Sequence, residues 1–138
     1  MPTSDEKKNI VRRIREEIIP SKNLSQLDGL YTDDYIYHGI PLIGDLTGVS
    51  AFKQLISSFS VGMPDGSERV ADQIAEGDTV VTRLTGTGTH TGELMGVPAS
   101  GKRIKFTAII ITRFSDGKIA EEWAEFDALS FSQQLRQP

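Results

Sequence analysis

Hydrophobic residues recur every three or four positions in two stretches of the chain, which is the spacing of a helix that buries one face. The first stretch repeats isoleucine at positions 10, 14 and 18 and follows a capping-box spacing from Thr3 to Glu6. We expect this helix to stop at Pro20. The second stretch begins at Val49 and ends near Gly62. Shorter helical segments are expected over residues 24–30 and 129–135.

The pattern changes after the second helix to runs rich in valine, isoleucine and threonine, which favour strands. We expect strands over residues 69–75, 79–90, 102–114 and 118–126. Residues 31–39 bring aromatic, acidic and histidine side chains together, and residues 41–48 are expected to form a loop. Helices followed by an antiparallel meander predict an α+β fold, in which a curved sheet encloses an apolar pocket.

The turn at Asp116-Gly117 is the strongest hairpin signal in the chain, and a two-residue turn fixes the register of its strands. With Ser115 opposite Lys118, three further pairs follow: Ile110 with Trp123, Ala108 with Glu125, and Phe106 with Asp127. Side chains alternate along a strand, so these six residues are predicted to share one face. The opposite face, which carries Ile109 and Ile111, is also apolar and could meet a partner subunit.

Carboxyl groups on that first face would lie among apolar neighbours, where desolvation raises their pKa toward the working pH. Such a group can take a proton from carbon or return one to a carbonyl. Asp127 is our first candidate and Glu125 the second. Asp127 also precedes a possible helix, so N-capping is an equally weighted interpretation. Glu121 and Glu122 are expected at the sheet edge in water.

Other polar side chains give weaker signals. His38 lies among tyrosines and could move a proton, although a lone histidine in such a segment is more often structural. For His90 we favour a turn in which the imidazole satisfies backbone groups. Two histidines so placed do not form a metal site. Trp123 is expected to be a pocket wall, because its ring offers area and a single donor.

The 138 residues suit one domain spanning positions 1–138, without cysteine and with a net charge of −4. This balance argues against nucleic-acid binding, and the one basic cluster, Arg12-Arg13 with Arg15, is interpreted as a solvated helix face. We find no signal peptide and no apolar stretch of about 20 residues. We therefore expect a soluble, cytoplasmic protein that does not engage membranes and needs neither metal nor cofactor.

Three segments together resemble the SnoaL-like polyketide cyclase family, within the wider nuclear-transport-factor-2-like superfamily that includes ketosteroid isomerase. They are residues 75–81 (AEGDTVV), 85–101 (TGTGTHTGELMGVPASG) and 116–127 (DGKIAEEWAEFD). The resemblance implies a cone-shaped α+β barrel, in which a strongly curved antiparallel sheet wraps around about three N-terminal helices, and it implies a homodimer. It also implies aldol-type ring closure without cofactor or metal, by an aspartate on a late strand that Asp127 matches best. His38, Trp123 and His90 match recurrent positions of the wider family.

The function expected from the sequence is that of a cofactor-independent acid/base enzyme, a lyase or isomerase, acting on a small hydrophobic carbonyl or polyketide-like compound. The alternative is a non-catalytic protein of the same fold that binds such a molecule. Asp127, Glu125 and His38 are the candidate catalytic residues. The expected substrate-binding residues are Trp123, Tyr35, Phe106, Ile110, Phe52 and His90.

Overall fold

The computed structural model describes residues 2–40 and 44–136. Its first helical segment runs continuously through α1 (Ser4–Arg13), η1 (Ile14–Ile18) and α2 (Ile19–Ser21). The capping box is confirmed, since the Thr3 side chain accepts from the backbone of Glu6 and the Glu6 side chain accepts from the backbone of Thr3. The segment ends one residue after Pro20, with Lys22 in a left-handed conformation. Its middle part, η1, has π-helical geometry.

The remaining elements follow the predicted order with two additions, the strands β1 and β2. They are η2 (Leu24–Leu27), β1 (Tyr31–Ile40), β2 (Gly44–Thr47), α3 (Val49–Gly62), β3 (Ser67–Glu76), β4 (Thr79–Thr89), β5 (Arg103–Ser115), β6 (Lys118–Phe126) and α4 (Ala128–Arg136). The prediction of a loop over residues 41–48 is wrong for Gly44–Thr47, which pairs with β1 as an edge strand. Positions 41–43 of that predicted loop lie outside the described residues.

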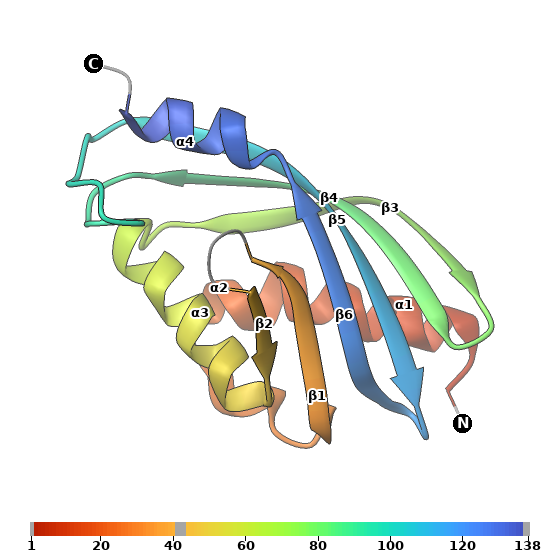
Figure 1. Ribbon diagram of the computed structural model, residues 1–138. Helices are drawn as coiled ribbons and strands as arrows, with labels where there is room; N and C mark the ends of the chain where they lie inside the picture. Colours follow the sequence, from red (N-terminus) through yellow and green to blue (C-terminus); the bar gives the residue numbers. More distant parts are fainter. Residues whose placement is uncertain (1, 41–43, 137–138) are drawn as a thin grey trace.

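The six strands form one curved, unclosed sheet with the order β2-β1-β6-β5-β4-β3. Neighbouring strands are antiparallel except β1 and β6, which pair in parallel and join the N-terminal half of the chain to its C-terminal half. Figure 1 shows the sheet bent over the first helical segment and α3, with α4 at one end. The predicted α+β fold, a curved sheet around helices, is confirmed. No helix in the described ranges is long and apolar enough to cross a membrane.

The register predicted for the last hairpin holds only next to its turn. Ser115 pairs with Lys118 as predicted, but a β-bulge between Arg113 and Phe114 leaves Ala120 without a direct partner. A bulge of one residue turns every later side chain to the other face of the sheet. Ile110 therefore pairs with Ala124, and the predicted pairing of Ile110 with Trp123 is wrong.

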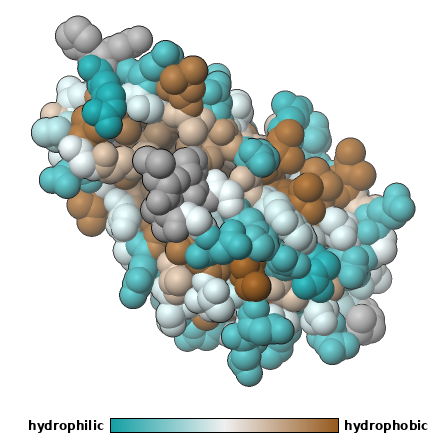
Figure 2. All heavy atoms as spheres, in the orientation of Figure 1, coloured by the Kyte–Doolittle hydropathy of each residue, from teal (hydrophilic) through white to brown (hydrophobic). Residues whose placement is uncertain are grey.

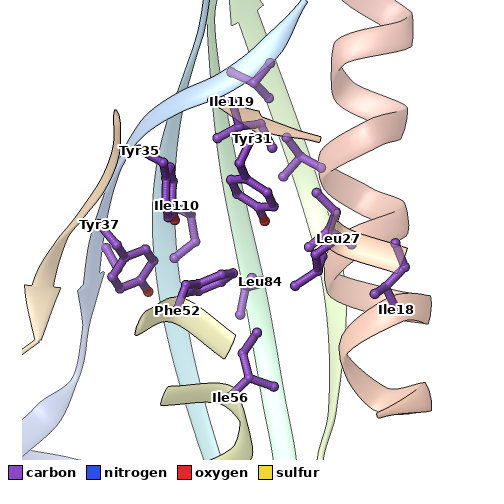
Figure 3. Packing of buried hydrophobic residues seen from close by; sticks show 14 of the residues in the cluster. Ile18, Leu27, Tyr31, Tyr35, Tyr37, Phe52, Ile56, Leu84, Ile110 and Ile119 are labelled. Atoms are coloured by element: carbon purple, nitrogen blue, oxygen red, sulfur yellow. The ribbon is translucent and has the colours of Figure 1, made fainter. Parts of the chain in front are cut away.

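The interior of the cone is filled mainly by aromatic and aliphatic side chains. Three tyrosines of β1, Tyr31, Tyr35 and Tyr37, point inward and lie against Phe52 of α3 (Figure 3). On the inner face of β4, a Cβ at Gly86 would lie only 2.2 Å from the Phe106 ring. The missing side chain therefore gives Phe106 its place in the interior.

Candidate functional site

A cavity of about 140 Å³ lies between α3, the end of the first helical segment (η1 and α2), and the inner face of the sheet. This is many times the roughly 10–15 Å³ that one water needs on a comparable measure. Pro64 and Ser67, both exposed, stand in its wall, so the cavity reaches the surface. A cavity of about 150 Å³ is large enough to bind benzene, so the volume and the opening suit a small organic molecule.

Most of the cavity wall is apolar. Of the residues predicted to contact a ligand, Phe52, Phe106 and Ile110 lie in this wall. The last strand contributes Ala124 and Phe126. Neither β5 nor β6 therefore presents an acid to the cavity.

The charged groups of the cavity come from the opposite side, from η1 and β3. Arg15 of η1 has only 7% of its side chain exposed, and its Nη1 lies 3.5 Å from Oε1 of Glu68. The guanidinium also stands 5.7 Å from the centre of the Phe52 ring, within cation–π range. The interpretation of Arg15 as part of a solvated face is wrong. Its position is one turn from Val11 and Ile18, on the buried stripe of the helix.

Burial controls the proton affinities of these groups. Desolvation raises the pKa of Glu68, and the neighbouring Arg15 offsets that rise only in part. For Arg15, burial favours the neutral form, but Glu68, Tyr37 and Glu122 together keep its pKa above the ordinary value. Burial likewise raises the pKa of Tyr37, which also lines the cavity. Arg15 is therefore a permanent cation, and Glu68 is a carboxyl group that holds its proton more tightly than usual.

Two buried polar atoms of cavity-lining residues make no hydrogen bond within the described residues. They are Nη2 of Arg15 and Oε1 of Glu68. Buried polar groups are almost always paired, and an unpaired one costs about 1–3 kcal/mol. These unpaired polar atoms mark this end of the cavity as the place where a polar group of a ligand, or water, would be held.

A second acid lies deeper in the core. Glu122 is only 3% exposed, and it accepts hydrogen bonds from the Tyr35 hydroxyl at 2.7 Å and the Thr112 hydroxyl at 2.6 Å. The prediction that Glu122 projects into water is wrong, because the bulge at Ala120 turns it inward. Tyr35, expected to bind the substrate, is fully buried and donates its hydroxyl to this acid.

The acids predicted to face the hollow point elsewhere. Asp127 is exposed and caps α4, its Oδ1 accepting from the Ser130 backbone at 3.0 Å. The N-cap interpretation is thus confirmed. Glu125 is exposed, and Trp123 is 37% exposed on the outer face of the sheet, so the prediction that these three side chains point inward is wrong. The cause in each case is the one-residue shift at Ala120.

The two histidines also lie away from the cavity wall. His38 stacks on Trp123 at 5.3 Å on the outer face, with Nδ1 2.9 Å from Asp45 and Nε2 2.7 Å from Glu121. His90 is fully buried, and its Nδ1 lies 2.9 Å from the Ser100 hydroxyl, so the prediction that its imidazole satisfies backbone groups is wrong. The backbone of His90 pairs instead with the backbone of residues 100–102. In the part of the chain that the structure describes, no group of three potential ligands is placed to hold a metal.

The functional candidates that the sequence analysis missed differ in how they could have been found. Arg15 had a signal, because it interrupts the apolar stripe of its helix. Glu122 had none, since no residue pattern around Ala120 indicates the bulge that turns Glu122 inward. Glu68 stands at the start of β3, where only the packing of the helix against the sheet decides what is buried.

Comparison with known proteins identifies relatives for almost the whole chain. The profile of the SnoaL-like polyketide cyclase family matches residues 9–135. TsrD from Streptomyces laurentii shares 25% identity at a TM-score of 0.86, covering 99% of this chain and 98% of that chain. A candidate polyketide cyclase from Acidithiobacillus ferrooxidans shares 28% at a TM-score of 0.83, covering 99% of each.

A third similar structure, a candidate SnoaL-like polyketide cyclase from Jannaschia sp. CCS1, has a TM-score of 0.88. It shares 21% identity and covers 100% of this chain and 96% of that chain, so the likeness concerns the fold alone. No curated protein matches the chain.

Removing the hydroxyl of Tyr35 should destabilise the protein. Tyr35→Phe leaves a buried oxygen of Glu122 without its donor, so we expect a loss of about 1–3 kcal/mol in the free energy of unfolding, measured in urea. Tyr31→Phe is the matched control, because the Tyr31 hydroxyl has no partner among the described residues. Its stability should be unchanged or slightly raised. Equal losses in both variants would contradict the assignment of the hydrogen bond.

The His38 cluster should make part of the stability depend on pH. Hydrogen bonds with Glu121 and Asp45 raise the pKa of His38 above 6.5, so folding favours its protonated form. The contribution is complete below the unfolded pKa and is lost as pH rises through the folded pKa. The melting temperature of the natural protein should therefore exceed that of His38→Gln most at acidic pH. A difference that stays constant into alkaline pH would show that the cluster does not titrate in this way.

Proposed function

Because the chain belongs to the SnoaL-like polyketide cyclase family, we propose that it carries out cofactor-independent acid/base chemistry on a small hydrophobic carbonyl compound. Aldol-type ring closure and isomerisation both begin with removal of a proton next to a carbonyl group. The observation that carries the proposal is the pair of Arg15 and Glu68 in the wall of an otherwise apolar cavity.

The two residues have complementary roles. Glu68, whose pKa burial raises, takes the proton from the carbon beside the carbonyl group and returns it later in the cycle. Arg15 directs its unpaired Nη2 group at the carbonyl oxygen and stabilises the negative charge that develops there. The apolar wall keeps water away, which strengthens both interactions. Proton transfer by a positioned side chain typically contributes about 10²- to 10⁴-fold to the rate.

The same cavity also supports the alternative of a binding protein without turnover. The specific observation in its favour is the wall formed by β5 and β6, whose cavity-lining residues are all apolar: Phe106, Ala108, Ile110, Ala124 and Phe126. In that case Arg15 and Glu68 hold the ligand's polar group and transfer no proton. An enzyme of the proposed kind would exchange a proton on a carbon atom of the ligand with solvent, whereas a binding protein would not.

Glu68→Gln should abolish proton exchange on a bound ketone, because an amide of the same shape cannot act as the base. The measurement follows exchange of the α-protons of small aromatic and alicyclic ketones in D₂O by NMR. With the natural protein, exchange should rise with pH as Glu68 ionises, and it should fall by about 10²-fold or more in the variant. The exposed Glu125→Gln is the matched control and should exchange at the natural rate.

Two outcomes would count against this function. Equal exchange in Glu68→Gln and the natural protein would remove Glu68 from the chemistry. Ketones that bind and stabilise the protein but show no exchange in either protein would support the binding alternative.

We also propose that the outer face of the sheet joins two copies of the chain. Ile109 and Ile111 are 46% and 36% exposed on this face, close to Trp123 of the neighbouring strand. Figure 2 shows hydrophobic side chains scattered among polar ones on the side of the molecule in view. A second copy of the chain that packs on this face would remove these apolar side chains from water, which favours self-association.

Sedimentation analysis tests the dimer. Ile109→Glu places a charge on the proposed contact and should convert the dimer to a monomer. Leu129→Glu, at an exposed position of α4, is the control and should leave the assembly intact. A natural protein that sediments as a monomer at high micromolar concentration would exclude the dimer.

A further inference from the structure

At the polar end of the cavity, the guanidinium of Arg15 has more hydrogen-bond donors than partners. Arg15 has 7% of its side chain exposed and lines the cavity. Only its Nη1 faces Glu68, and its Nη2 is buried without a partner among the described residues. A guanidinium binds planar anions through two adjacent N–H groups, and a carboxylate fits this geometry best. The cavity thus offers half of a carboxylate-binding fork.

The rest of the cavity selects what is attached to that carboxylate. Phe52, Phe106 and Phe131 supply aromatic walls, and Ile56 and Ile110 supply aliphatic ones. A dianion such as a phosphate would find one cation and a neighbouring acid, which is too little to offset its desolvation. A monoanion with an apolar body meets both parts of the site.

The carboxylate of Glu68 would repel the carboxylate of such a ligand, and this repulsion decides how the ligand binds. Its Oε1 already stands 3.5 Å from Arg15, so a second carboxylate would bring two negative charges to one cation. Glu122 of β6 lies close enough to raise the pKa of Glu68 further. Tyr37 of β1 is neutral at ordinary pH, since the ordinary pKa of tyrosine is about 10 and burial raises it further. The conflict disappears if one carboxyl group is protonated.

We propose that the cavity binds hydrophobic carboxylic acids, with Arg15 pairing with the ligand carboxylate and Glu68 taking up one proton as the ligand enters. In the complex, protonated Glu68 donates its O–H to the ligand carboxylate and Arg15 donates through Nη2. The cavity then holds one cation beside one ligand anion. Burial already favours the protonated form of Glu68, so the proton taken up lands on the group that accepts it most readily. The inference uses the site of the proposed function but requires no turnover.

Calorimetry with matched ligand pairs tests the proposal. Benzoate, 2-naphthoate and octanoate are each compared with the primary amide of the same shape, at about pH 6 and about pH 8. We expect each acid that fits to bind at least tenfold tighter than its amide at the lower pH. Its affinity should fall by about tenfold per pH unit once Glu68 is ionised in the free protein. Buffers of different ionisation enthalpy should reveal uptake of close to one proton at the higher pH.

Variants separate this inference from a merely structural role. Glu68→Gln carries a permanently neutral side chain, so it should bind the acids tightly at both pH values, with no proton uptake. Arg15→Lys keeps the charge but loses the planar fork, so it should reduce the preference for acid over amide. Glu125→Gln should reproduce the natural pH dependence.

Equal affinity for acids and amides in the natural protein would overturn the proposal. So would a pH dependence and proton uptake that persist in Glu68→Gln. Absence of ketone exchange would leave the binding result standing, because calorimetry measures no turnover. Conversely, loss of the preference for acids would leave the exchange experiment unaffected.

Discussion

One extra residue in β6 determines which chemistry faces the interior of this protein. Because Ala120 is accommodated as a bulge, Glu122, Ala124 and Phe126 turn inward while Trp123 and Glu125 turn outward. Without the bulge, Glu121, Trp123 and Glu125 would face the interior. Glu122, which now accepts a hydrogen bond from Tyr35 in the core, would face outward. The bulge thus fixes both the composition of the cavity wall and the position of the buried Glu122.

The shape and the charge of the cavity therefore come from different elements. Apolar side chains of β5 and β6 form one wall of the cavity, whereas Arg15 reaches it from η1 and Glu68 from the beginning of β3. Such a division allows the buried ion pair to be held by two elements that pack firmly against each other. The cost of burying these charges falls on the folded state, which is a common feature of sites that bind or transform ligands.

The sequence was sufficient for the fold but only partly for the site. Periodicity and turn residues locate both long helices and the four-stranded meander, because local pattern decides those elements. The bulge at Ala120 has no such local signature, so the predicted faces of Trp123 and Asp127 were inverted. Arg15 was readable in principle, as a charge on the buried stripe of its helix. The burial of Glu68 depends on packing between distant segments and could not be read from the chain.

The parallel pairing of β1 with β6 has a consequence for how the protein is made. His38 aligns with Trp123, so the sheet cannot be completed until β6 has left the ribosome. Contacts between such distant segments close late and slowly, because the entropy of the long intervening loop is lost first. The wall that β6 contributes to the hollow therefore forms only after β6 has emerged, and shortening the chain before β6 would leave β1 and its tyrosines without their neighbour.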